Sequence, residues 1–422
     1  MATKLKILVV NKYFYIRGGA EKVFFDEVSL LEQKGHEIGV FSMEHPRNAP
    51  SRYAPFFVSG VDYEGKMGTW QKLWEAGRIL YSLEAKKKMR RLLQQEHFDL
   101  VHLHNIYHQI SPSILDAIAT AGLPAVMTLH DYKMVCPTYS LLADKRVCEC
   151  CFQGRYFHSL WRRCAKDSYA KSFLSMAEMY LHHRLLKIYG KVALFIAPSR
   201  FLKAKVEESG FPYRIIHLPY FLNARDYQPN FISEEQSLVY FGRLSPEKGL
   251  ETLIKAMSGV PANLKIIGEG PQRPRLEYLA GQLRLNNVQF LGYRQGDALF
   301  DEIKKSRFTV LPSEWYENYP VSVLESFALG KPVVGARIGG IPELVRDHDT
   351  GLTFEPGNIQ DLQEKICFLM EEPDVITAMG KRARQFVEEV ADPERHYQKL
   401  LKIYHLVIDS HLKETFKQSK IS

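Results

Sequence analysis

The sequence predicts an α/β protein built from two doubly wound, Rossmann-like domains that face a common cleft. Short β-rich runs alternate with amphipathic helical stretches, which is typical of βαβ units and parallel sheets. These units form two series, separated by a polar and aperiodic segment at 221–236. The length of 422 residues is sufficient for two sizeable cores.

The first series opens with a buried strand at 6–11 and an amphipathic helix over 20–34, which Gly35 ends. Its further strands are expected at 36–42, 99–104, 124–130, 192–197 and 214–220. Strands of the second series are expected at 237–242, 263–268, 288–292, 308–312, 332–335 and 351–355. A long amphipathic helix over 392–416 follows. The predicted divisions are a first domain at 1–225, a second domain at 226–391 and a C-terminal helical segment at 392–422.

Composition excludes several classes of protein. Hydrophobic residues make up 45% of the chain and charged residues 25%, so collagen-like and disordered chains are excluded. The longest apolar stretch, near 192–198, is far shorter than the roughly 20 residues of a membrane span, and the N-terminus has no signal-peptide core, so we expect a cytoplasmic protein. The net charge of +8 suits an anionic partner such as a nucleotide diphosphate, a phospholipid surface or nucleic acid.

A glycine-rich turn follows the first strand of the second series. In this turn, Gly242 allows close approach of the backbone, Arg243 offers a forked donor and Lys248 a point charge. This pair suits a pyrophosphate, whereas a basic turn without a ligand is the alternative.

Two glutamates, Glu317 and Glu325, lie eight positions apart. On a continuous helix they would be separated by about 12 Å along the axis and about 80° around it. Glycosidases need carboxyl groups at most about 9.5 Å apart, so this pair fits two hydroxyl-binding groups at opposite ends of an elongated ligand better. Two solvated glutamates on a surface helix remain the alternative.

Two further motifs lie in the first series. Gly18 and Gly19 precede a helix and could present amides to an anion or hydroxyl group. His130 ends a predicted strand and is a candidate to hydrogen-bond a sugar hydroxyl, with a purely structural histidine as the alternative.

Taken together, these motifs and the sequences Gly-Gly-Ala-Glu at 18–21 and Gly-Gly-Ile-Pro-Glu at 339–343 resemble the retaining, group 1 (family 4) glycosyltransferases of the GT-B fold. The resemblance implies that Arg243 and Lys248 hold the donor diphosphate and stabilise its leaving charge. It also implies that Glu325 binds the ribose, that Glu317 and His130 contact the donor sugar, and that Gly19 borders the phosphate and acceptor region.

The resemblance further implies metal-independent chemistry with no required cofactor, a nucleotide diphosphate sugar donor and a saccharide or lipid-linked saccharide acceptor. The chain departs from many relatives after the first glutamate, where Asn318, Tyr319 and Pro320 replace Gly-Phe-Gly. These three residues are predicted to contact substrate, although Pro320 has no N–H to donate.

Five of the six cysteines lie between 136 and 164, inside a long insertion at 132–170. A structural zinc site is one interpretation of this clustering, with the thiolate ligands Cys136, Cys148, Cys151 and Cys164. A disulfide pair and plain buried thiols are the others.

A single helix is expected over 69–93, with tryptophans on one face and a basic end at 86–91. It could rest on an anionic membrane at the inner face or pack into the core.

The residues and the resemblance together favour a retaining hexosyltransferase, and the resemblance implies a role in cell-surface polysaccharide or glycolipid synthesis. The alternatives are a nucleotide-sugar epimerase or hydrolase on the same scaffold, and a non-catalytic anion-binding or nucleic-acid-binding protein. The basic residues are dispersed without an aromatic-rich stripe, so no nucleic-acid partner is expected.

Overall fold

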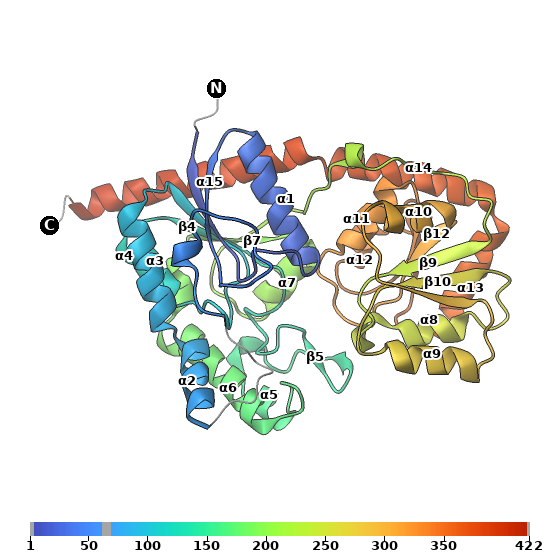
Figure 1. Ribbon diagram of the computed structural model, residues 1–422, viewed down its shortest axis with the longest axis horizontal. Coiled ribbons are helices and arrows are strands. Elements are labelled where there is room, and N and C mark those ends of the chain that lie inside the picture. Colours follow the sequence, from blue (N-terminus) through green and yellow to red (C-terminus); the bar gives the residue numbers. More distant parts are fainter. Residues whose placement is uncertain (1–3, 61–68, 420–422) are drawn as a thin grey trace.

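Two six-stranded parallel sheets, each flanked by helices, lie side by side in the protein (Figure 1). The computed structural model describes the backbone of residues 4–60 and 69–419 and the side chains of residues 4–60 and 75–413. Each sheet has its own hydrophobic core, so the predicted α/β fold of two Rossmann-like domains is confirmed.

The first sheet has the strand order β2-β1-β3-β4-β7-β8. The order reverses between β1 and β3, so the loops that follow these strands open a crevice at their carboxyl ends. The strands are β1 (Lys6–Val10), β2 (Glu37–Phe41), β3 (Leu100–Leu103), β4 (Ala125–Thr128), β7 (Leu194–Ala197) and β8 (Ile215–His217). The helices are α1 (Gly19–Gln33), α2 (Thr69–Leu80), α3 (Leu83–Gln95), α4 (Ile114–Thr120), α5 (His158–Trp161), α6 (Tyr169–Tyr180) and α7 (Arg200–Glu208), and a short hairpin of β5 (Leu142–Ala143) and β6 (Arg146–Val147) lies in the insertion.

The second sheet has the strand order β11-β10-β9-β12-β13-β14, which reverses between β9 and β12. Its strands are β9 (Ser237–Phe241), β10 (Asn263–Ile267), β11 (Val288–Gly292), β12 (Phe308–Leu311), β13 (Val333–Ala336) and β14 (Gly351–Phe354). The helices are α8 (Leu250–Ala256), α9 (Arg273–Gln282), α10 (Asp297–Lys305), α11 (Val321–Ala328), α12 (Ile341–Leu344), α13 (Ile359–Glu371) and α14 (Pro373–Val390). Every strand predicted for the two series is present.

The last helix, α15 (Pro393–Ser419), runs from the end of α14 along the first domain (Figure 1). Leu400, Tyr404 and Val407 belong to the hydrophobic core of the first sheet. The chain thus returns to its first domain after it has completed the second.

The expectation of one helix over 69–93 is wrong, because α2 ends at Leu80 and α3 begins at Leu83. Ser82 caps α3 by accepting a hydrogen bond from the amide of Ala85, and this cap starts a new helix axis. The side chains of Trp70, Leu73 and Trp74, on which the predicted membrane contact depended, lie outside the described residues.

Several polar contacts join the two domains. The carboxylate of Glu343, from α12, accepts hydrogen bonds from the amides of Arg200 and Phe201 at 3.0 and 2.7 Å. These amides lie in the first turn of α7, where a helix has unsatisfied N–H groups. Glu343 therefore serves as a cap for a helix of the other domain.

We expect Glu343→Ala to weaken this contact by about 1 kcal/mol, the usual effect of losing a helix cap. Hydrogen exchange at the amides of Arg200 and Phe201 should become about fivefold faster, since 1.4 kcal/mol corresponds to tenfold. Glu364→Ala, which removes an exposed glutamate on α13, is the control. Unchanged exchange in Glu343→Ala would show that the contact does not hold the domains together.

Candidate functional site

The turn after β9 carries the two predicted diphosphate ligands. Arg243 is exposed, and its carbonyl accepts a hydrogen bond from the hydroxyl of Tyr240 at 2.8 Å. Gly249 has a φ of +67°, and a Cβ atom there would lie 1.9 Å from the carbonyl oxygen of Pro312. This position therefore requires glycine, which lets the turn lie directly against the loop that follows β12.

A salt bridge joins these two loops. The Nζ of Lys248 lies 2.5 Å from Oε1 of Glu317, and the hydroxyl of Ser313 donates to the same oxygen at 2.6 Å. Glu317 is only 6% exposed. Burial alone would raise the pKa of its carboxyl, but the charge and hydrogen bond of Lys248, together with Ser313, outweigh burial and lower it. The pair lies at the reversal between β9 and β12, the usual ligand position in such a sheet.

Glu325 lies on α11, whereas Glu317 precedes that helix, so the two glutamates do not share a continuous helix. Burial raises the pKa of Glu325 to about 7, with Lys22 lowering it and Asp26 raising it. Lys22 and Asp26 belong to α1, and they form an ion pair with each other at 3.0 Å. Glu325 of the second domain therefore faces the first helix of the first domain.

The loop of Gly18 and Gly19 meets α11 at its beginning. Both glycines are exposed, and a Cβ atom on Gly19 would lie 3.7 Å from Cγ2 of Val321. The structure thus brings the predicted glycine loop close to the helix that bears Glu325.

The residues after Glu317 contact the first domain with their side chains. Asn318 accepts a hydrogen bond from the hydroxyl of Ser199 at 2.9 Å, and the ring of Tyr319 packs against Tyr220 with centroids 5.6 Å apart. Pro320 is the cap residue of α11. These side chains hold the domains together here, and their predicted substrate contacts stay a prediction.

Both ring nitrogens of His130 are occupied. Nε2 lies 2.8 Å from Nδ1 of His104, and Nδ1 lies 2.7 Å from the hydroxyl of Tyr220. Burial, and then the neighbouring His104, hold the pKa of His130 well below its usual value, so the ring is neutral. A sugar hydroxyl would have to replace one of these partners, and the predicted sugar contact of His130 stays a prediction.

Sequence reasoning missed a charged pair on the first domain. Lys12 follows β1, and burial lowers its pKa while the charge of Asp131 raises it. Asp131 follows β4, and burial raises its pKa against the opposing effect of Lys12. Their position in the sequence could have indicated them, because each follows a parallel strand of the first sheet at the carboxyl edge where ligands bind.

The insertion places a tyrosine near these charges. Tyr139 is 50% exposed, and its pKa is raised by burial and by Asp131, with Arg243 and Arg17 opposing. Since Arg243 belongs to the second domain, the insertion reaches the predicted diphosphate region.

A cavity of 560 Å³ opens between the insertion and the second domain. Its walls include the hairpin of β5 and β6, the segment after α5, and the turn that contains Gly249. Both signs of charge line it on each side: Asp144, Lys145, Arg162, Arg163 and Asp167 from the insertion, and Glu247, Glu251, Lys255 and Glu314 from the second domain. A cavity of this size and polarity can hold a saccharide unit.

The four cysteines predicted as zinc ligands gather in one region of the insertion. Burial, and then the neighbouring Cys136 and Cys148, raise the pKa of Cys164 to about 11. In the described part of the chain, however, no three thiols come close enough to share one ion. The structural zinc site therefore stays a prediction.

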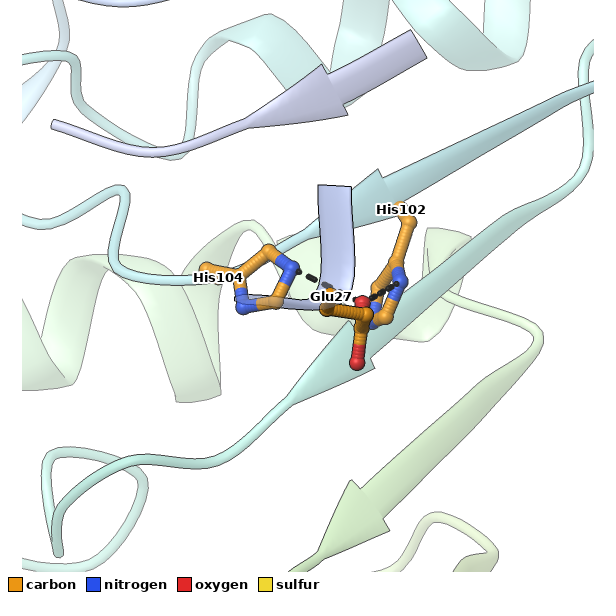
Figure 2. A group of neighbouring side chains, drawn as sticks. All are labelled: Glu27, His102 and His104. Atoms are coloured by element: carbon orange, nitrogen blue, oxygen red, sulfur yellow. Dashed lines mark ion pairs between the residues drawn. The ribbon is translucent and has the colours of Figure 1, made fainter. Parts of the chain in front are cut away.

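The structure instead brings Glu27, His102 and His104 within reach of one ion (Figure 2). All three are buried between α1 and β3. Sequence reasoning noted only that the two histidines share a face of their strand.

Comparison with known proteins agrees with this architecture. Glycosyltransferase Family 4 matches residues 17–220, and Glycosyl transferases group 1 matches residues 225–386. The N-acetyl-alpha-D-glucosaminyl L-malate synthase of Bacillus anthracis is 24% identical over 93% of this chain and 94% of its own length. The alpha-D-kanosaminyltransferase of Streptomyces kanamyceticus is 24% identical over 83% of this chain and 86% of its own.

Solved structures share the fold. Sucrose-phosphate synthase from Thermosynechococcus elongatus superposes with a TM-score of 0.71 at 17% identity, covering 96% of this chain and 100% of its own. Anabaena Alr3699/HepE in complex with UDP and glucose superposes with a TM-score of 0.62 at 20% identity, covering 94% and 99%. The chain belongs to the group 1 (family 4) glycosyltransferases and is a glycosyltransferase of the GT-B fold.

Proposed function

We propose that this enzyme transfers a hexosyl unit from a nucleotide diphosphate sugar to an acceptor hydroxyl with retention of the anomeric configuration. The observation that carries the proposal is the contact between Lys248 and Glu317, beside Arg243, at the reversal point of the second sheet. Cations for a diphosphate and a carboxylate for sugar hydroxyls thus occupy adjacent positions. Glu325 lies on α11, the helix that follows Glu317, and we place the ribose there.

In the proposed reaction the acceptor oxygen attacks the anomeric carbon on the face from which the diphosphate leaves. The bond between that carbon and the diphosphate oxygen breaks, and the departing oxygen takes the acceptor's proton. Arg243 and Lys248 stabilise the charge that develops on the diphosphate, so no divalent cation is needed for this step. Glu317 is engaged by Lys248 and Ser313, which suits hydroxyl binding better than covalent attack.

The donor assignment is tested by thermal shift and calorimetry with UDP, UDP-glucose, GDP and GDP-mannose. UDP is a sound probe because HepE, which shares the fold, was solved with it. We expect Arg243→Ala to weaken binding of the accepted nucleotide by about 10- to 100-fold, the effect of losing a charge-assisted hydrogen bond. Lys248→Ala should do the same, and its stability is measured separately because it leaves Glu317 without its cation.

Lys381→Ala, on an exposed position of α14, is the control and should bind normally. Full nucleotide affinity in Arg243→Ala would refute the donor site.

Proton NMR of the first product formed should show the donor's anomeric configuration, and added Mg²⁺ or Mn²⁺ should leave the rate unchanged. Inversion would refute retention. Full-rate sugar release or isomerisation without an acceptor would identify a hydrolase or epimerase instead.

The pKa of about 7 at Glu325 predicts a pH-dependent nucleotide affinity. Only the ionised carboxylate accepts hydrogen bonds from both ribose hydroxyls, and ionisation rises through pH 7. Affinity should therefore increase up to about tenfold between pH 6 and pH 8. Glu325→Gln should bind more weakly with a flat profile, whereas Glu355→Gln, on an exposed glutamate, should keep the slope. An identical slope in Glu325→Gln would assign the titration to another group.

We further propose that the acceptor is a saccharide or lipid-linked saccharide, received at the first domain near an anionic membrane. Among the described residues, no helix has the length and apolar character to cross a bilayer. The proposal is supported by exposed aromatic side chains around α5 and on α6, at the end of the first domain opposite α15 (Figure 1). These side chains, here called the aromatic patch, are Phe157, Trp161, Tyr169 and Phe173.

Basic residues surround the aromatic patch. Between positions 155 and 173 the chain has five of them and one acidic residue, Asp167. The basic residues are Arg155, Arg162, Arg163, Lys166 and Lys171. Aromatic side chains at the level of lipid headgroups, with cations beside them, are typical of peripheral binding to anionic bilayers.

Vesicle sedimentation tests this surface. The wild-type protein should bind vesicles that contain phosphatidylglycerol and should not bind pure phosphatidylcholine vesicles. Trp161→Ala with Phe173→Ala should lower the binding at least tenfold, because apolar area is lost. Tyr278→Ala removes an exposed aromatic from the second domain and is the control. If light scattering shows a dimer that this double substitution dissociates, the patch is instead an interface between two copies.

A further inference from the structure

The carboxylate of Glu27 lies in the core of the first domain among three histidines. Oε1 lies 2.9 Å from Nδ1 of His102 and 3.4 Å from Nε2 of His104, and Oε2 lies 3.5 Å from Nε2 of His396 (Figure 2 shows the first two). Glu27 lies on α1, His102 on β3, His104 directly after β3, and His396 on α15. All four are buried, so water cannot offset the negative charge.

Several atoms of this cluster have no hydrogen-bond partner within the described chain. They are Oε1 of Glu27, Nε2 of His104 and Nε2 of His396. These atoms face one another at ion-pair distance without hydrogen-bond geometry, and a buried polar atom without a hydrogen bond costs about 1–3 kcal/mol, so the arrangement favours a ligand between them. In the part of the chain that the structure describes, the ion-pair partners of Glu27 are histidines alone.

The far side of each imidazole is occupied. Nε2 of His102 lies 2.8 Å from the hydroxyl of Thr128, and Nδ1 of His104 lies 2.8 Å from His130. Nδ1 of His396 lies 2.9 Å from the carbonyl oxygen of Pro219, to which it donates. A histidine that ligates a metal usually engages its second nitrogen in this way, which fixes the ring.

We propose that Glu27, His102 and His104 bind a zinc ion, while His396 lies against the other carboxylate oxygen of Glu27. Two imidazole nitrogens and a carboxylate oxygen form a set that zinc accepts. Tetrahedral zinc with bonds near 2.0–2.1 Å places its ligand atoms about 3.3 Å apart, close to the 2.9 and 3.4 Å found here. The hydroxyl of Tyr404, 2.8 Å from Nδ1 of His102, gives way to the ion.

The role of this ion is structural. The site is buried, and its ligands join the first helix to a central strand and to the residue just after that strand, while His396 of the last helix lies against the carboxylate of Glu27. Zinc at this point would fasten α1 to the central strand β3 of the first domain.

The site is tested in the full chain with Cys148→Ser and Cys151→Ser, which removes thiolate ligands from the insertion. After zinc loading and desalting, mass spectrometry should find about one zinc per chain. Cobalt should give visible ligand-field bands without the thiolate charge-transfer band. A chelator should lower the Tm of this protein, and zinc should restore it, because a bound ligand stabilises the folded state.

Glu27→Gln, added to the two serine substitutions, keeps the shape of the side chain and should abolish both the retained zinc and the Tm response. His97→Ala removes an exposed histidine from the same domain and should change neither. No retained metal and no Tm response in the serine variant would overturn the proposal and identify a metal-free imidazolium network. Thiolate bands that persist would likewise overturn it, because sulfur would then bind the ion.

Discussion

A buried ionised carboxylate needs cations or hydrogen bonds to offset its charge, and at Glu317 these come from Lys248 and Ser313. Lys248 lies in the loop after β9 and Glu317 in the loop after β12. If either loop moved, the carboxylate of Glu317 would lose its cation or become exposed. The close approach of Gly249 to Pro312 gives the salt bridge its geometry. Arg243 lies in the same turn as Lys248, and the segment that docks on the first domain directly follows Glu317, so both adjoin this contact.

The order of elements could be predicted from the sequence because their periodicity is local. Buried parallel strands appear as short apolar runs, and every such run became a strand of one of the two sheets. The break between α2 and α3 escaped this reasoning because helical periodicity continues across it. A single serine cap at Ser82 redirects the chain, and such a residue inside an apolar pattern has no distinct signature.

The candidate site could be predicted in part. Arg243, Lys248 and Glu317 lie in short motifs, and the structure brings the last two into contact. Contacts between distant segments could not be predicted. The docking of Asn318 on Ser199 and the approach of His396 to Glu27 arise only when the two domains pack and the last helix returns. The zinc site predicted from the cysteines of the insertion stays a prediction.

Glu27, His104, His130 and Tyr220 form one continuous line from the core to the domain boundary. A neutral imidazole has one N–H, so the tautomer of each histidine fixes that of the next. If Nε2 of His104 donates to Glu27, His130 donates to Nδ1 of His104, and the hydroxyl of Tyr220 donates to His130. If a cation occupies that nitrogen of His104, every donor reverses, and the phenol keeps its proton for another acceptor. Whether a cation or a proton lies on Nε2 of His104 therefore sets the direction in which each group of this hydrogen-bonded chain donates, as far as Tyr220 at the domain boundary.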